Sequence, residues 1–226
     1  MKDLRLAICG FGIVGKRRAE CLAKLQNVKV VGVCDKNPQQ MQFLSGDVRR
    51  FSSYKELFDF GEFDGILICL SNDLAAEVTC AGLRAGKHVF CEKPPAISMF
   101  ELSKVERVWN PECGLVLKYG FNHRYHHSVQ LAKSIIDSKE YGEVINLRGV
   151  YGKSQLVTFG QDEWRTQRSI AGGGVLLDQG IHMLDLILLF AGPFNEIKSF
   201  ISRSHWPYDV EDNAYALMKN TDTGVV

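Results

Sequence analysis

The chain has 226 residues, of which 46% are hydrophobic and 23% are charged, and its net charge at neutral pH is +1. This is ordinary globular composition, with enough apolar material for one large or two small domains. Without a basic run there is no electrostatic case for nucleic acid or an anionic membrane, and the longest apolar run, residues 186–191, is too short to span a bilayer.

The first 120 residues alternate short apolar runs with segments of helical spacing. The runs that predict strands are residues 4–9, 28–34, 65–70, 88–91 and 115–119, and the predicted helices are 13–25, 38–44, 54–60, 74–85 and 98–108. Continuous apolar strands alternating with helices predict a doubly wound parallel sheet with helices on both faces. We therefore expect an α/β domain over residues 1–120.

The pattern changes after residue 120. A helix at 128–138, a strand at 144–151, a helix after a glycine triplet, and strands at 197–204 and 213–219 predict an α+β domain over residues 121–226, with an open, mainly antiparallel sheet. Residues 219–224 resemble a hairpin turn, and Val225 and Val226 would begin a return strand. A domain that ends as a strand begins is expected to be incomplete.

Seven cysteines are present, none of them in a C-x-x-C pair, and the N-terminus does not resemble a signal peptide. We therefore expect reduced thiols and a cytoplasmic protein. Cys9, Cys34, Cys69 and Cys91 fall near the ends of predicted strands. They are expected to act as small buried hydrophobic residues, not as nucleophiles.

A glycine motif of the form G-x-G-x-x-G lies between the first strand and the first helix. Gly10 would allow the tight turn, Gly12 the close approach of a pyrophosphate, and Gly15 the packing of helix on strand. The intervening residues of this cofactor loop are Phe11, Ile13 and Val14. Asp35, which ends the second strand, would bind the adenosine ribose and favour NAD over NADP, although Lys36 beside it softens this preference. The alternative is a glycine turn that binds no ligand.

Two further features carry candidate chemistry. Lys93 follows the fourth strand, at the sheet edge where such folds bind ligands, and Pro94 favours an extended conformation for it. Asp178 and His182 are four residues apart on a predicted helix and would share one face. The alternatives are a surface lysine on a turn and a polar pair with a purely structural role.

These motifs together resemble one family. The glycine loop, the run AGKHVFCEKP at residues 85–94, and GGG with D, G and H at 172–182 are similar to the glucose–fructose oxidoreductase, inositol dehydrogenase and rhizopine-catabolism (Gfo/Idh/MocA) family. The resemblance covers essentially the whole chain. It implies an N-terminal Rossmann domain and a C-terminal domain that carries the substrate site and often the oligomer interface.

The resemblance also implies roles for residues at matching positions. Lys93, Asp178 and His182 match the catalytic positions, and the implied substrate-binding residues are Asn122, Arg124, Trp164 and Arg165 together with Asp178 and His182. Ser71, Asn72, Glu92 and Lys93 join the glycine loop and Asp35 as expected cofactor-binding residues.

The sequence also departs from the family at several positions. Where many members read T-P-N after the third strand, this chain has Leu70-Ser71-Asn72, so only the asparagine matches. His127 stands where proline is usual. Members continue past residue 226, and the chain therefore resembles a C-terminally shortened member.

The expected chemistry is hydride transfer between a secondary alcohol and nicotinamide, by an NAD(P)-dependent dehydrogenase acting on CH–OH groups. His182 is suited to be the general base, Asp178 could orient it or bind a hydroxyl, and Lys93 could hold the reacting oxygen. The glycine triplet would leave room for substrate and backbone near the nicotinamide ring. On the resemblance alone, the substrate is a polyol, sugar, amino sugar or nucleotide-linked sugar.

Other functions remain open. A retained NAD could drive hydrolysis or epimerisation through transient oxidation, or the protein could be a non-catalytic NAD-binding regulator. No metal is expected, because no cysteine or carboxylate at ligand spacing joins His123, His126 and His127. A homo-oligomer through the C-terminal sheet is expected on the resemblance.

Overall fold

The computed structural model describes residues 3–44, 46–152, 154 and 163–226. The chain divides into two compact units, Met1–Gly120 and Phe121–Val226.

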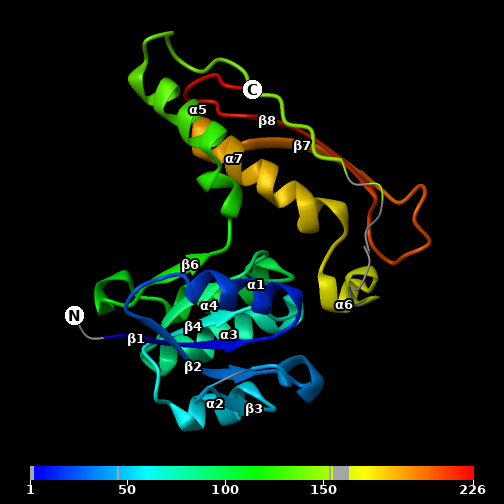
Figure 1. The fold of residues 1–226 in the computed structure, drawn as a ribbon. Coiled ribbons are helices and arrows are strands. Elements are labelled where there is room, and N and C mark those ends of the chain that lie inside the picture. Colours follow the sequence, from blue (N-terminus) through cyan, green and yellow to red (C-terminus); the bar gives the residue numbers. More distant parts are fainter. Residues whose placement is uncertain (1–2, 45, 153, 155–162) are drawn as a thin grey trace. The chain divides into compact units, whose positions relative to one another are not determined.

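The first unit is a six-stranded parallel sheet with the strand order β3-β2-β1-β4-β5-β6 (Figure 1). Its elements in chain order are β1 (Leu4–Cys9), α1 (Ile13–Leu22), β2 (Val28–Cys34), η1 (Pro38–Met41), β3 (Arg49–Phe51), α2 (Tyr54–Phe60), β4 (Gly65–Ile68), α3 (Asn72–Arg84), β5 (His88–Cys91), α4 (Met99–Val108), η2 (Pro111–Cys113) and β6 (Leu117–Tyr119). The predicted doubly wound sheet is confirmed. The order reverses between β1 and β4, which is where such sheets bind ligands.

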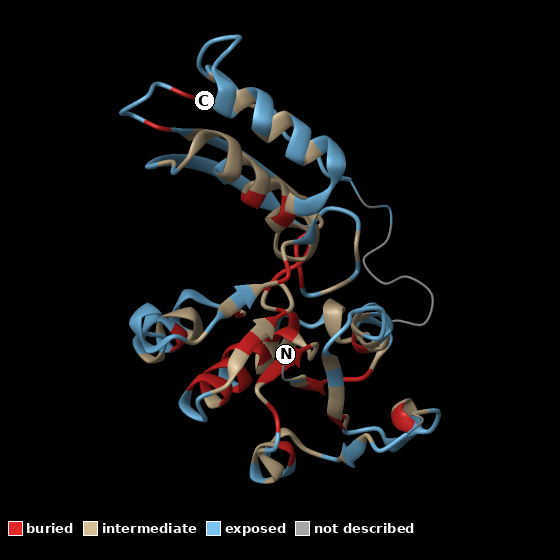
Figure 2. Cartoon of the chain, turned by 60° about the vertical axis from the view of Figure 1, so that its left-hand side comes forward, coloured by how far each residue is buried: buried red, intermediate tan, exposed pale blue. Residues whose placement is uncertain are grey.

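Apolar side chains cover both faces of this sheet because successive residues of a strand point to opposite sides. Ala7 and Cys9 of β1 lie in one buried cluster with Val78 of α3. Leu6 and Ile8 lie in a second cluster on the other face. Figure 2 shows the buried residues concentrated in these central strands. The continuous apolar runs of the sequence therefore reflect strands that are buried on both faces.

Two helices of this unit, α2 and α4, begin at a serine cap. The hydroxyl of Ser53 accepts a hydrogen bond from the Glu56 N–H at 3.3 Å, and Ser98 does the same for Glu101 at 3.3 Å. The short edge strand β3 was not predicted, because its three residues include two arginines and form no apolar run.

The second unit contains η3 (Asn122–Tyr125), α5 (His127–Ser138), η4 (Glu163–Thr166), α6 (Arg168–Ala171), the π-helical turn η5 (Leu176–Gly180), α7 (Ile181–Ala191), β7 (Glu196–Ser202) and β8 (Asn213–Lys219). β7 and β8 form an antiparallel pair in which Phe200 lies opposite Tyr215. Helix α5 lies beside α7 (Figure 1). The unit is α+β with a small antiparallel sheet, as predicted.

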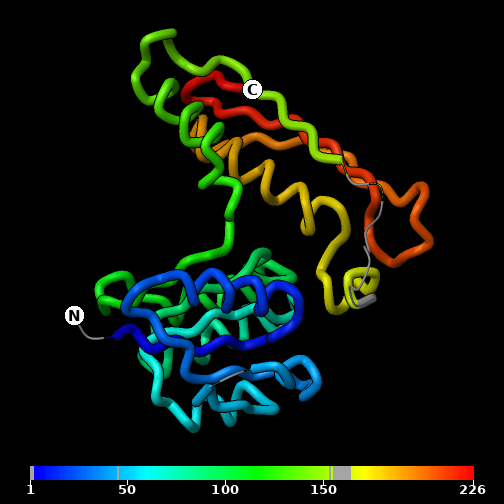
Figure 3. Tube along the Cα trace, viewed as in Figure 1, coloured from blue at the N-terminus to red at the C-terminus, as the bar shows by residue number. Residues whose placement is uncertain are grey.

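The predicted strand at residues 144–151 is wrong. This segment runs beside the end of the chain (Figure 3), where the Leu147 N–H donates to the Val226 carbonyl at 2.9 Å, but it is not a strand. Its β-branched residues Ile145 and Val150 are exposed. An extended segment becomes a strand only when a neighbour pairs along it, and β7 and β8 pair with one another. A turn does form at residues 220–225, with Asn220 N–H donating to the Val225 carbonyl, but Val225 and Val226 are not part of a strand.

One helical stretch among the described residues, Arg168–Ala191, is long and apolar enough to cross a membrane by length and composition alone. It has 24 residues and a mean hydropathy of 1.6 in its most apolar window. Asp178, His182 and Asp185 interrupt the apolar residues of this stretch. The sequence therefore contains no long continuous apolar run here that would have indicated it. This is weak support for a membrane span, since core helices of soluble proteins share these properties.

Candidate functional site

The glycine loop has distinct steric requirements at its three glycines. Gly10 has φ +89°, and a Cβ there would overlap the carbonyl oxygen of Cys69 and approach its carbonyl carbon to 2.6 Å. A Cβ on Gly15 would overlap the carbonyl oxygen of Gly10. Nothing lies within 4 Å of a Cβ placed on Gly12. Gly10 and Gly15 are therefore required by the turn itself, whereas Gly12 leaves open space at the N-terminus of α1, where helix N–H groups favour an anion.

Asp35 is held beside this loop. One carboxylate oxygen accepts the Phe11 N–H at 2.7 Å, and the other accepts the Asn37 N–H at 2.8 Å. These bonds join the end of β2 to the loop after β1, and they leave the carboxylate charge at the sheet edge where a ribose would lie in a dinucleotide fold. The loop and the acid therefore form a cradle that fits a dinucleotide.

The other predicted cofactor residues follow β4 and β5. Ser71 and Asn72 stand at the start of α3, and Asn72 is buried. The Glu92 carboxylate accepts from Arg18 Nε at 2.7 Å, and only 17% of its side chain is exposed. This ion pair ties the end of β5 to α1. Lys93 is next in the chain, is half-buried, and is joined to Pro94 by a cis peptide bond, where the sequence indicated only an extended residue.

Three thiols at the strand ends, those of Cys9, Cys69 and Cys91, have raised pKa values. A hydrogen bond with the Cys34 thiol, followed by burial, raises the pKa of Cys9 well above its usual value. Burial raises the pKa of Cys69, and it raises the pKa of Cys91 to about 12. These groups stay protonated near neutral pH and are buried or half-buried, so thiolate chemistry at this edge is not supported.

In the second unit, Asp178 and His182 do not share a regular α-helix. Asp178 lies in the π-helical turn η5, where the Ile181 N–H donates to the Leu176 carbonyl, and His182 lies in the first turn of α7. The wider turn changes the angular spacing between the two residues from that of the predicted i, i+4 pair. The spacing of Asp178 and His182 is that of a regular helix, so the sequence did not indicate the π turn. Such turns are frequent at functional sites.

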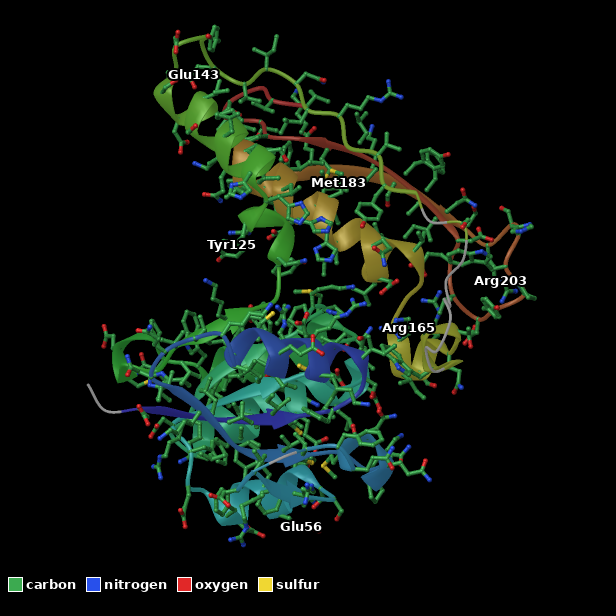
Figure 4. The ribbon with its side chains drawn as sticks, viewed as in Figure 1. Glu56, Tyr125, Glu143, Arg165, Met183 and Arg203 are labelled. Carbon is green, nitrogen blue, oxygen red and sulfur yellow. The ribbon has the colours of Figure 1, made fainter. Side chains whose placement is uncertain are left out.

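Asp178 forms a cluster with η4. Its carboxylate lies 3.8 Å from Arg165 Nε and accepts the Gln179 side-chain amide at 2.8 Å. The Arg165 guanidinium stacks over the Trp164 ring at 4.3 Å. Figure 4 shows Arg165 just before α6 and Met183, the residue after His182, on α7. The structure thus brings together three of the predicted substrate residues, Trp164, Arg165 and Asp178.

A second cluster surrounds His182, whose residue is only 5% exposed. The ring of His123 stacks on it with centroids 4.0 Å apart, and the Phe121 ring meets it edge-on at 6.3 Å. Arg124 donates two hydrogen bonds to Asp185, at 2.7 and 2.5 Å. The hydrogen bonds to Asp185 raise the pKa of Arg124, so this arginine remains charged. Arg124 is therefore engaged within the protein, while Asn122 beside it is exposed.

The room at Gly174, the last glycine of the triplet, is occupied by the backbone of another segment. A Cβ on Gly174 would overlap the carbonyl oxygen of Glu211 and lie 2.8 Å from its nitrogen. The buried Glu211 carboxylate accepts the Gly174 N–H at 2.7 Å, and its carbonyl accepts the Val175 N–H at 3.0 Å. The space left by Gly174 is filled by the 209–211 segment, which caps the start of η5.

Sequence reasoning missed three residues of this unit. Asp185 could have been found, because it lies one helical turn after His182 in the same motif. His123 was considered only as a metal ligand. Glu211 gave no signal, since it is 37 residues from the glycine that it contacts. Within the described ranges, no group of three or more His, Cys, Asp or Glu side chains could hold a metal ion.

Two family profiles match the chain. Residues 4–111 match an oxidoreductase family with an NAD-binding Rossmann fold, and residues 129–226 match the GFO/IDH/MocA C-terminal domain.

Individual relatives agree with this assignment. Glucose-6-phosphate 3-dehydrogenase of Bacillus subtilis is 30% identical over 84% of this chain, which spans 55% of that relative. The crystal structure of myo-inositol 2-dehydrogenase from Lactobacillus plantarum is 29% identical and superposes with a TM-score of 0.87, covering 99% of this chain and 68% of that one. A levoglucosan dehydrogenase in complex with NADH and levoglucosan, 24% identical, shares the fold with a TM-score of 0.89 over 99% of this chain and 65% of its own. The chain thus spans about half to two thirds of these relatives.

Proposed function

Because the chain belongs to the GFO/IDH/MocA family of oxidoreductases and carries an NAD-binding Rossmann fold, we propose that it transfers a hydride between NAD and a secondary alcohol of a sugar-like substrate. The observation that carries the proposal is the cradle of the first unit, in which open space at Gly12 lies at a helix N-terminus and Asp35 is fixed beside the loop. The substrate class rests on the relatives, which are named as dehydrogenases of glucose 6-phosphate, inositol and levoglucosan.

Different residues of the cradle would bind different parts of the cofactor. The N–H groups at the start of α1 would bind the pyrophosphate, and Asp35 would accept hydrogen bonds from the adenosine ribose. Ser71 and Asn72 at the start of α3 would contact the adenosine side, and Glu92, fixed by Arg18, would hold the backbone that presents Lys93. Bound NAD would supply the hydride acceptor.

The protein must then handle the proton of the substrate hydroxyl. His182 would accept it as general base, and Lys93 would hold the reacting oxygen and stabilise its negative charge. Asp178, held by Arg165, would accept hydrogen bonds from other substrate hydroxyls, in a cluster with Trp164. Asn122 is available to the substrate because it is exposed, whereas Arg124 would act through its ion pair with Asp185.

The proposal is tested by incubating the protein with NAD and a panel of polyols, hexoses, amino sugars and nucleotide sugars, and recording NADH absorbance. Release of NADH with one class supports the dehydrogenase. Exchange of substrate hydrogen with solvent, without net NADH, would indicate redox-assisted hydrolysis or epimerisation with a retained cofactor. Binding of NADH without either reaction would indicate a non-catalytic regulator.

Asp35 is expected to decide between the two nicotinamide cofactors. Replacing it with asparagine removes the negative charge that would repel a 2′-phosphate, so the preference for NADH over NADPH should fall by about 10-fold or more. Fluorescence titration with each cofactor measures this ratio, and Asp59→Asn, an exposed acid on α2, is the matched control. An unchanged ratio in Asp35→Asn would contradict the assignment of Asp35 to the ribose.

We also propose that the β7–β8 sheet pairs with a second copy of the chain. Phe200 and Tyr215 are cross-strand partners on one face and are 82% and 71% exposed, and Leu217 is exposed on the same face. Exposed apolar patches of this kind mark interaction surfaces.

Replacing Phe200 with lysine should therefore shift the protein toward monomer, with at least about a 10-fold weaker dimerisation constant, because a charge would be buried at the interface. Sedimentation velocity over a concentration series measures it. Phe43→Lys is the control, since Phe43 is 88% exposed in the first unit. If the wild-type chain is monomeric throughout the series, this pairing is excluded.

A further inference from the structure

The ring of His182 has another imidazole on its face. His123 of η3 stacks on it at 4.0 Å with an angle of 20° between the ring planes. The other ring partners of His123 are Tyr151, stacked at 5.9 Å and 13°, and His126, tilted at 5.1 Å. His182 is buried, His123 is half-buried and His126 is exposed.

The position of His123 is fixed by its neighbour in the chain. Arg124 makes a two-bond ion pair with Asp185, whose side chain is 8% exposed on α7. Asp185 lies one helical turn after His182. Bidentate arginine–carboxylate pairs hold a defined geometry, so this pair locks η3 against the helix that carries His182.

At this distance, protonation of one stacked imidazole changes the electrostatic energy of protonating the other. One protonated ring over one neutral ring is attractive, as in other cation–π contacts, whereas two protonated rings repel. We propose that His123 is a positioning residue for His182: it holds the plane of the His182 ring, and the stacked pair binds its second proton less readily than its first.

Several charged groups on the elements packed around the two rings pair with one another. These pairs are Arg124 with Asp185 on η3 and α7, Arg165 with Asp178 on η4 and η5, and Lys133 with Asp137 on α5. Other titratable groups on η3, α5 and the coil around Tyr151 are His126, His127, Tyr125, Tyr151 and the exposed Arg148.

The consequence for catalysis rests on the proposed function. When His182 takes the hydroxyl proton, a neutral His123 on its face would stabilise the imidazolium. A protonated His123 would oppose this step. Both rings must therefore be neutral before turnover begins, which makes the acid side of the pH profile depend on His123 as well as on the base itself.

The inference is tested first without activity, by NMR titration of the histidine side chains in ¹⁵N-histidine-labelled protein. In the wild type, the His182 and His123 signals should report one another's protonation in coupled steps. In His123→Phe, which keeps a stacked ring but removes the proton, His182 should titrate in a single step with its midpoint raised by about half a pH unit or more. His205→Phe is the control, because His205 is an exposed histidine between β7 and β8.

Independent single-step titrations of the two histidines in the wild type would overturn the inference, and so would an unchanged His182 midpoint in His123→Phe. The wild-type measurement stands even if a variant fails to fold.

A second experiment compares the turnover of the variants. His123→Ala should lower kcat about 10-fold with an unchanged NADH dissociation constant, and His123→Phe should retain most of the kcat but shift the acid limb of the pH profile. Coupled titration in a protein that oxidises no sugar would leave the inference intact and refute the proposed function. Sugar oxidation with uncoupled titration would overturn the inference and support the proposed function.

Discussion

Replacing Lys93 with alanine is expected to lower kcat/KM for sugar oxidation by about 10²–10³-fold, the usual loss when one group that stabilises a developing oxyanion is removed. The lysine follows β5, at the carboxyl edge of the parallel sheet, where ligands of this fold bind. NADH affinity should change by no more than a few-fold, because the lysine is assigned to the reacting oxygen and the glycine loop to the pyrophosphate. Steady-state kinetics together with NADH titration separates the two effects.

Lys104→Ala provides the matched control. Lys104 is an exposed lysine on α4 that lies over the Phe100 ring, so its loss should leave turnover unchanged. A thermal melt of each variant shows whether the fold is kept. Full turnover in Lys93→Ala would remove this lysine from the mechanism, and equal losses in both variants would point to a general effect of lost charge.

The second large effect is expected at Gly12. Alanine there should weaken NADH binding by about 100-fold or more, because its methyl group would occupy the space through which a pyrophosphate reaches the backbone. Stability should change by less than about 1 kcal/mol. Gly12 has φ −70°, which alanine adopts freely, so the gain from a less flexible unfolded chain offsets the weaker helix cap.

Gly15→Ala should behave in the opposite way. Its Cβ would overlap the Gly10 carbonyl oxygen, which is backbone and cannot move aside cheaply, so unfolding free energy should fall by about 1–3 kcal/mol. Urea denaturation and NADH titration on both variants test the pair. Gly152→Ala is the control, because nothing lies within 4 Å of a Cβ placed on Gly152. Gly86→Ala is unsuitable, because Gly86 has φ +68°. If Gly12→Ala binds NADH normally, the loop does not hold the pyrophosphate as proposed.

The first unit could be predicted almost completely because its signals are local. A strand such as Leu4–Cys9 is buried on both faces, so its sequence is apolar throughout, and the glycine spacing that follows is imposed by backbone contacts within the same turn. Ser53 and Ser98 marked helix starts through contacts only three residues away.

The second unit was predicted less well. Residues 144–151 have strand-like composition, but no neighbouring strand pairs along them. Glu211 fills the space at Gly174, which from the sequence alone could equally have held substrate. Asp178 lies in a π turn beside Arg165, and His182 lies in the first turn of the regular helix with the His123 ring stacked on it.

Residue order therefore specified the parallel sheet, the cofactor loop and the identity of Lys93, Asp178 and His182 as candidates, since each depends on contacts within one turn or on burial along one strand. Folding in three dimensions alone set the surroundings of those candidates: the stack of His123 on His182, the ion pair of Arg124 with Asp185 and the cap from Glu211. These contacts join segments 37 to 61 residues apart, and side chains that meet only after the chain has folded leave no periodic pattern along it.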